Sequence, residues 1–93
     1  MYKHGYVYIL TNVSKTMLYV GVTSNLTQRI WQHKQKIYPN CFTTKFNIHL
    51  LVYCEVHTSI GDAIKREKEI KGWKRSKKNA LIQTKNPKWE TLQ

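Results

Sequence analysis

Short runs of β-branched and aromatic residues, separated by polar turns, mark the first half of the chain. Tyr6 to Leu10 and Met17 to Val22 both have the composition of strands. The polar segment Asn12 to Lys15 between them predicts a hairpin. A third strand is expected over His49 to Val56, where the alternation is less regular and predicts cover on both faces.

The length of the hairpin turn sets the expected pairing of the first two strands. If the loop is the four residues 12–15, Thr11 faces Thr16. Antiparallel pairing then places Tyr8 directly across from Tyr19. We therefore expect two phenol side chains to be neighbours on one face of the sheet.

A helix is predicted to follow the hairpin. Asn25 is the expected N-cap, with Gln28 three residues later, and the helix should end near Ile37, before a proline. At 100° per residue, Arg29 and His33 project within or beside the apolar stripe, one turn apart. A guanidinium and an imidazole are therefore expected to face the sheet. The apolar stripe itself consists of Leu26, Ile30 and Ile37.

A second helix is expected from Ser59 to about Trp73, with Asp62 completing a capping box. Glu67 projects into the middle of its apolar face, whereas Glu69 points to the opposite side. A carboxylate in an apolar stripe costs several kcal/mol unless it is paired or bound to a metal. Glu67 therefore requires a partner. The expected apolar face consists of Ile60, Ala63, Ile64 and Ile70.

The rest of the second half predicts a short helix and an irregular tail. The helix should extend from about Ser76 to Thr84, and the tail from Asn86 to Gln93, with Trp89 packed on the core. A chain of 93 residues is long enough for one core, so residues 1–93 are expected to form a single domain.

The net charge of the chain indicates which class of molecule it binds. The 16 Lys and Arg residues against 5 Asp and Glu give a formal net charge of +11, and no acidic side chain precedes Glu55. Such an excess favours a polyanion as partner, and nucleic acid is the expected one. No apolar run is long enough for a membrane span, so we expect no membrane partner and a cytoplasmic protein, nucleoid-associated if bacterial.

One basic stretch is the candidate nucleic-acid contact. Between residues 65 and 78 it holds eight basic residues interrupted by Trp73. A solvated helix face is the alternative interpretation. Lys45, in the segment Phe42 to Phe46, is a further candidate if that segment is a substrate-facing loop, although turn residues explain it nearly as well. The basic candidates are Lys45, Lys65, Arg66, Lys68, Lys71, Lys74, Arg75, Lys77 and Lys78.

The order of these motifs resembles the GIY-YIG nuclease superfamily, in particular its small stand-alone members. The two defining motifs correspond to residues 6–8 and 19–21, ten residues apart. The first motif has Tyr6-Val7 in place of Gly-Ile, which is a conservative change at its second position. Further matching stretches are residues 23–26, 42–46, 51–55, 63–67, 70–73 and 86–89, so the resemblance covers nearly the whole chain.

The resemblance implies an α+β fold with a three-stranded antiparallel sheet flanked by helices. It also implies metal-dependent hydrolysis of phosphodiester bonds by one Mg²⁺ or Mn²⁺ ion, as in endonucleases of DNA repair or recombination. By position, the family's functional residues fall on Tyr8, Tyr19, Arg29, His33 and Glu67. DNA is favoured over RNA as the substrate, and a monomer is expected.

These positions allow a one-metal mechanism. Glu67 would anchor the ion, Arg29 would bind phosphate oxygens, and Tyr8 would orient or deprotonate the attacking water, supported by Tyr19 and His33. Alternatives stay open for the residues and for the domain. In the structural alternatives, Tyr8 and Tyr19 only pack across the strands, His33 has a structural role, and Arg29 forms a buried salt bridge with Glu67 without metal. In the functional alternatives, the domain clamps nucleic acid without cutting it or serves in a ribonucleoprotein assembly.

Overall fold

A three-stranded antiparallel sheet forms the centre of the protein in the computed structural model, which describes residues 4–36 and 42–92. The strand order is β2-β1-β3, so the first strand of the chain is central. The predicted α+β architecture is confirmed. The strands are β1 (Gly5–Thr11), β2 (Leu18–Thr23) and β3 (Leu50–His57).

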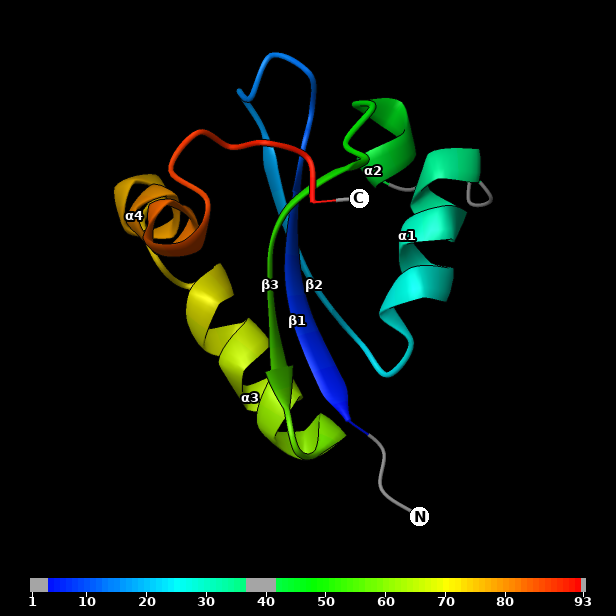
Figure 1. The fold of residues 1–93 in the computed structure, drawn as a ribbon, viewed down its shortest axis with the longest axis vertical. Helices are drawn as coiled ribbons and strands as arrows, with labels where there is room; N and C mark the ends of the chain where they lie inside the picture. The colour runs from blue at the N-terminus through cyan, green and yellow to red at the C-terminus, as the bar shows by residue number, and fades with distance from the viewer. Residues whose placement is uncertain (1–3, 37–41, 93) are drawn as a thin grey trace.

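Helices cover both faces of the sheet (Figure 1). The helices α1 (Leu26–Gln35) and α2 (Phe42–Lys45) lie on one face, and α3 (Ile60–Lys71) and α4 (Arg75–Lys85) lie on the other. Two apolar clusters match these layers. On the α3 and α4 side, the buried residues are Val7, Ile9, Val20, Val52, Tyr53, Ala63, Ile70 and Ile82. On the α1 and α2 side, they are Tyr8, Leu10, Ile30, Ile48 and Leu51.

Both predicted N-caps are confirmed. The side chain of Asn25 accepts a hydrogen bond from the backbone N–H of Gln28 (3.1 Å), and Ser59 accepts one from the N–H of Asp62 (3.2 Å). These bonds satisfy helix donors that lack a partner within the helix. The helix α1 ends at Gln35, whereas its predicted end at residue 37 lies outside the described residues. None of the helices in the described part of the chain is long and apolar enough to cross a membrane.

The predicted hairpin register is wrong by two residues. Thr11 pairs with Leu18 rather than with Thr16, so Tyr8 lies opposite Gly21. The loop is longer than expected because the side-chain oxygen of Asn12 accepts hydrogen bonds from the backbone N–H groups of Thr16 (2.9 Å) and residue 17 (3.1 Å). A shift by two residues leaves every side chain on its predicted face.

The irregular alternation of the third strand has a structural cause. Ile9 of β1 pairs with Tyr53, but the next residue of β1, Leu10, pairs with Leu51. Val52 is therefore the extra residue of a β-bulge. The bulge brings the adjacent Val52 and Tyr53 into the same apolar cluster, which a regular strand with period two cannot do.

Two predicted surfaces differ from the structure. Ile64 was expected on the inner face of its helix, but it is 38% exposed. The buried line of α3 follows Ala63, Glu67 and Ile70, and Ile64 lies about a quarter turn from its middle. The segment Phe42 to Phe46, interpreted as either a substrate-facing loop or a turn, contains the short helix α2 (Phe42–Lys45), and the exposed rings of Phe42 and Phe46 are in contact.

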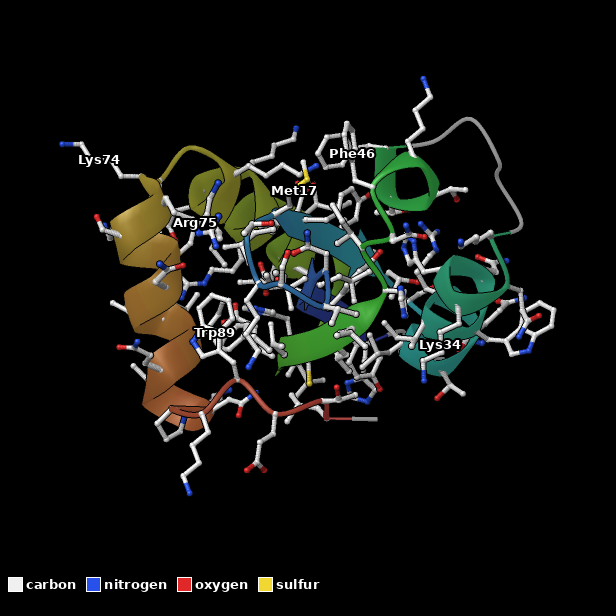
Figure 2. All side chains as sticks on the ribbon, turned by 90° about the horizontal axis from the view of Figure 1, so that it is seen from above. Met17, Lys34, Phe46, Lys74, Arg75 and Trp89 are labelled. Carbon is white, nitrogen blue, oxygen red and sulfur yellow. The ribbon has the colours of Figure 1, made fainter. Side chains whose placement is uncertain are left out.

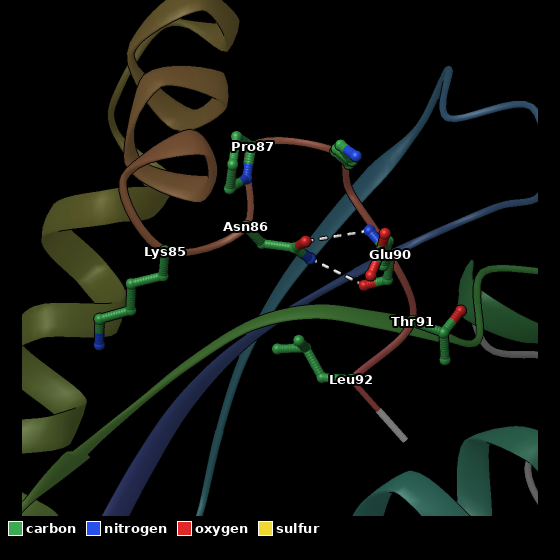
Figure 3. A pocket seen from close by; sticks show the side chains of 7 residues that line it. Lys85, Asn86, Pro87, Glu90, Thr91 and Leu92 are labelled. Atoms are coloured by element: carbon green, nitrogen blue, oxygen red, sulfur yellow. Dashed lines mark hydrogen bonds between the residues drawn. The ribbon is translucent and has the colours of Figure 1, made fainter.

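The buried side chain of Asn86 helps to fix the C-terminal tail to the sheet, together with the N–H of Leu92, which donates to the carbonyl oxygen of Leu51 (2.8 Å). Asn86 donates hydrogen bonds to the carbonyl oxygens of Val52 (2.9 Å) and Glu90 (2.7 Å), and its own side-chain oxygen accepts from the N–H of Glu90 (3.0 Å). Figure 3 shows the two bonds to Glu90, beside a pocket of about 320 Å³ lined by residues 85–88 and 90–92. Trp89 packs on the core, as predicted.

Replacing Asn86 with alanine is expected to destabilise the protein by about 1–3 kcal/mol, because the carbonyl of Val52 would lose a buried partner and the tail would lose one of its anchors. Urea unfolding followed by circular dichroism measures this change. The control is Gln83→Ala on the exposed side of α4, which should stay within about 0.5 kcal/mol of the wild type. Equal stabilities of the two variants would contradict this role of Asn86.

Candidate active site

Gly21 makes room for the phenol of Tyr8. A Cβ atom at Gly21 would lie 2.4 Å from both Cζ and Oη of Tyr8 and 2.9 Å from Cε2 of Tyr19. The fully buried ring of Tyr8, which belongs to the central strand β1, therefore extends over Gly21 of the edge strand β2. The missing side chain of one strand positions the functional group of its neighbour at the edge of the sheet.

Two tyrosines and a histidine form a triangle beside this edge. The ring centroids of Tyr8 and Tyr19 are 6.3 Å apart, and the ring of His33 lies 6.0 Å from Tyr8 and 5.6 Å from Tyr19. The hydroxyl of Tyr8 and Nε2 of His33 form a 3.2 Å hydrogen bond. The hairpin and α1 thus bring together three side chains that the sequence placed on separate elements.

The second nitrogen of His33 is held by a residue that the sequence analysis missed. Nδ1 of His33 forms a 3.0 Å hydrogen bond with Oγ1 of Thr43, which is buried at the start of α2. Burial, followed by the positive charge of Arg29, lowers the pKa of His33 below its ordinary value. A neutral imidazole in this position can accept one proton at one nitrogen while it donates at the other.

The lowered pKa of His33 makes a prediction about stability. The unfolded chain binds a proton at His33 more tightly than the folded protein does. The contribution of neutral His33 to the free energy of unfolding is therefore fully present above the unfolded pKa of ~6.5. It is lost as the pH falls through the lower pKa of the folded state. We expect His33→Gln to remove part of the stability loss between pH 7 and pH 5, measured by urea unfolding of the metal-free protein. An NMR titration midpoint of His33 at or above ~6.5 would contradict this expectation.

Arg29 lies one turn before His33 on α1 and is half-buried. Its charge acts on both neighbours, since it lowers the pKa of His33 and opposes the increase at Tyr8. Burial nevertheless raises the pKa of Tyr8 well above its ordinary value, with smaller contributions from Tyr19 and Glu67. Tyr8 therefore retains its proton near neutral pH.

Glu67 reaches the same region from the opposite face of the sheet. It is 8% exposed on α3, and its charge contributes to the raised pKa of Tyr8. Its ion-pair partner within the described residues is Lys71, with Nζ 2.6 Å from Oε2, rather than Arg29. Nζ of Lys71 also lies 5.9 Å from the ring centroid of Tyr19. The second half of α3 is therefore close to the tyrosines of the hairpin.

Comparisons with known proteins identify the family. Residues 4–80 match the model of the GIY-YIG catalytic domain. The chain belongs to the GIY-YIG family. A UPF0213 protein of Syntrophus aciditrophicus (strain SB) is 38% identical over 77 residues, which cover 83% of this chain and 87% of that protein. The solution NMR structure of a UPF0213 protein of Bacillus halodurans matches with a TM-score of 0.60 and 28% identity, covering 95% of this chain and 92% of that one.

The GIY-YIG domain is typical of endonucleases, which generally use a divalent metal ion. In the described part of this chain, no group of three or more His, Cys, Asp or Glu side chains is arranged to hold a metal. Among the described residues Glu67 is the buried acidic residue, and its charge acts on Tyr8. This donor set fits Mg²⁺ or Mn²⁺, because Mg²⁺ is usually bound by one or two carboxylates and retains several water ligands.

The nine basic residues predicted to contact nucleic acid fall into two groups. Arg66 and Lys71 are neutralised by carboxylates, Arg66 by Glu55 (2.8 Å) and Glu69 (2.5 Å). Glu55 is available as a charged partner for Arg66. Burial alone would raise the pKa of Glu55, but hydrogen bonds from neighbouring side chains and the charge of Arg66 bring this pKa below the ordinary value of a glutamate. The other cations, which form no ion pair within the described residues, are Lys45, Lys65, Lys68, Lys74, Arg75, Lys77 and Lys78.

Proposed function

We propose that this protein is a metal-dependent endonuclease that hydrolyses phosphodiester bonds in DNA. The observation that supports the proposal is that polar side chains from three separate elements contact Tyr8 or act on it electrostatically at the β2 edge. Tyr8 and Tyr19 come from the hairpin, Arg29 and His33 from α1, and Glu67 from α3. Packing alone does not require a buried carboxylate, a guanidinium and an imidazole to converge around two phenols.

Glu67 is the residue that would hold the divalent ion. When bound, such an ion would neutralise charge on the reacting phosphate and lower the pKa of a bound water. In the structure the carboxylate faces the ammonium of Lys71, whose side chain is half-exposed. The side chain of Lys71 is therefore free to turn toward solvent when another cation binds to Glu67.

Tyr8 and His33 would carry the proton of the attacking water. Because the pKa of Tyr8 is raised, its side chain is a neutral phenol rather than a phenolate base before the reaction. The hydrogen bond to Nε2 of His33 offers a relay instead. The oxygen of Tyr8 would accept the water proton while its own proton passes to neutral His33, whose Nδ1–H is held by Thr43.

Arg29 and Tyr19 would bind the scissile phosphate. The planar guanidinium of Arg29 suits two non-bridging phosphate oxygens. The hydroxyl of Tyr19 would donate to the same group; its ring lies 5.6 Å from the ring of His33 and 5.9 Å from Nζ of Lys71. The unpaired cations on α2, α3 and α4 would attract the flanking phosphates of the substrate.

One observation favours a second function, a clamp that binds nucleic acid without cutting it. The ion pair with Lys71 satisfies Glu67 without any metal, so the buried carboxylate is also compatible with a purely structural role. In that case DNA affinity would be independent of divalent ions.

An assay of purified protein on branched, nicked and linear DNA separates the two functions. With Mg²⁺ or Mn²⁺ we expect cleavage, and with a chelator we expect binding alone. Arg29→Ala should lose cleavage by about 10²-fold or more while it still binds DNA. Strong binding with no cleavage of any substrate in either metal would establish the clamp and reject the nuclease.

A further inference from the structure

A second concave surface lies on the opposite side of the sheet from α1. It is a shallow depression of about 330 Å³, open to solvent, between the β1–β2 loop, the N-terminal part of α4 and the C-terminal tail. In Figure 2, Arg75 and Trp89 lie together on the α4 side. We call this surface the tail hollow. It contains no acidic residue, and its lining consists of Lys15, Arg75, Asn79, Lys88 and Trp89.

The guanidinium of Arg75 is fixed without being neutralised. Its nitrogens donate to the carbonyl oxygens of Thr16 (2.8 Å) and Lys15 (3.0 Å) and to the side-chain oxygen of Asn79 (2.9 Å). These acceptors carry no formal charge, in contrast to the two carboxylates that hold Arg66. The side chain therefore presents a full positive charge in one orientation, with N–H groups to spare, which favours an anion.

Trp89 supplies a flat wall with little freedom to move. Its backbone is left-handed (φ 55°), its N–H donates to the carbonyl of Asn86 (3.0 Å), and one part of the indole packs on the apolar cluster beneath α4. The neighbouring residue, Lys88, also lines the hollow. An indole beside cations is the combination that binds nucleotides by base stacking and phosphate contact.

We propose that the tail hollow binds one nucleotide of a nucleic-acid strand, with the phosphate near Lys15, Arg75 and Lys88 and the base against Trp89. The volume suits a ligand of this size. Lys15 is four residues from Tyr19, so the Cα atoms of these two residues are at most about 14 Å apart, which is about four base-pair steps. The inference rests on the proposed function for the presence of the strand, and it adds a second anchor that orients the strand.

Binding of a fluorescent DNA strand, measured by anisotropy in the presence of a chelator, tests the tail hollow independently of cleavage. Lys15→Gln and Lys88→Gln should each weaken binding by about 3- to 10-fold and reduce the salt slope by about one unit. The matched control is Lys34→Gln on exposed α1, which removes the same charge and should leave affinity within about twofold. Equal losses in all three variants would reduce the effect to net charge and overturn the proposal.

Two further ligands test whether a base contacts Trp89 and whether the bound nucleotide belongs to a strand or is free in solution. A strand of equal length with abasic positions should bind about 5-fold or more weakly, because each stacked base contributes about 1–3 kcal/mol. Equal affinity for both strands would reject the contact with Trp89. A free mononucleotide that binds as tightly as the strand would reject strand anchoring. Failure to cut DNA would leave these binding results intact, so the two proposals can fail separately.

Discussion

Replacing Glu67 with glutamine is expected to reduce metal-dependent cleavage by about 10³-fold or more, which is a loss of about 4 kcal/mol of transition-state stabilisation. The amide keeps the size of the carboxylate but lacks the charge that would hold a divalent cation near Tyr8 and Tyr19. Single-turnover cleavage at saturating DNA measures the loss. DNA binding should persist, because the substitution makes the protein more positive.

Glu69→Gln is the matched control for this prediction. Glu69 lies on the same helix and undergoes the same chemical change, but its side chain is 57% exposed and pairs with Arg66. Its cleavage rate should stay within about threefold of the wild type, since exposed ion pairs contribute little. Similar rates for the Glu67 and Glu69 variants would show that the buried carboxylate has no special role in the reaction.

Gly21→Ala is expected to reduce cleavage by about 10²-fold or more although residue 21 has no functional group. The new Cβ would lie 2.4 Å from the phenol of Tyr8, and this ring is fully buried. The ring must therefore move, and it would lose its 3.2 Å contact with His33. A displacement of about 1 Å at a reacting group is enough for an effect of this size. Crowding should also lower stability by about 1–3 kcal/mol.

Gly61→Ala separates this steric effect from a general sensitivity to alanine. A Cβ at Gly61 would approach only Oγ of Ser59, at 3.9 Å, and the position is exposed on α3. Alanine should stabilise this helix by about 0.4–1 kcal/mol and leave cleavage unchanged. Cleavage and urea unfolding of the two variants test the contrast. A Gly21 variant that cuts DNA at the wild-type rate would contradict the position assigned to Tyr8.

The three strands, the three longer helices and most of their inward faces were predictable from the sequence because they follow from local chemistry. The caps at Asn25 and Ser59 satisfy donors of their own helices, and the helical period separates buried Glu67 from exposed Glu69. The two tyrosines were placed on the correct face of the hairpin because a shift of two residues preserves side-chain direction.

The contacts that the sequence analysis missed connect segments distant along the chain. The register error arose from the side chain of Asn12, which lengthens the loop. The bond between His33 and Thr43 requires the packing of α2 against α1, which periodicity does not encode. The partner of Glu67 was visible in principle, because Lys71 is four residues further along the same helix and such pairs are neighbours.

Arg75 illustrates the same limit for charge. Its contact with nucleic acid stays a prediction, and the structure adds a role that the basic stretch did not indicate: the guanidinium holds the backbone of the hairpin loop about 60 residues earlier, at Lys15 and Thr16. The count of charges in a segment therefore does not distinguish a cation with a structural contact from a free one. Three-dimensional packing makes this distinction, and it also leaves Arg75 available to an anion.

Manganese binding followed by NMR tests most directly whether the hairpin, α1 and α3 form one cation site. Paramagnetic Mn²⁺ should broaden the resonances of Tyr8, Tyr19 and His33 selectively in the wild-type protein, and this broadening should disappear in the Glu67→Gln variant. Broadening that is unchanged in the variant, or that affects residues remote from the β2 edge, would contradict the site.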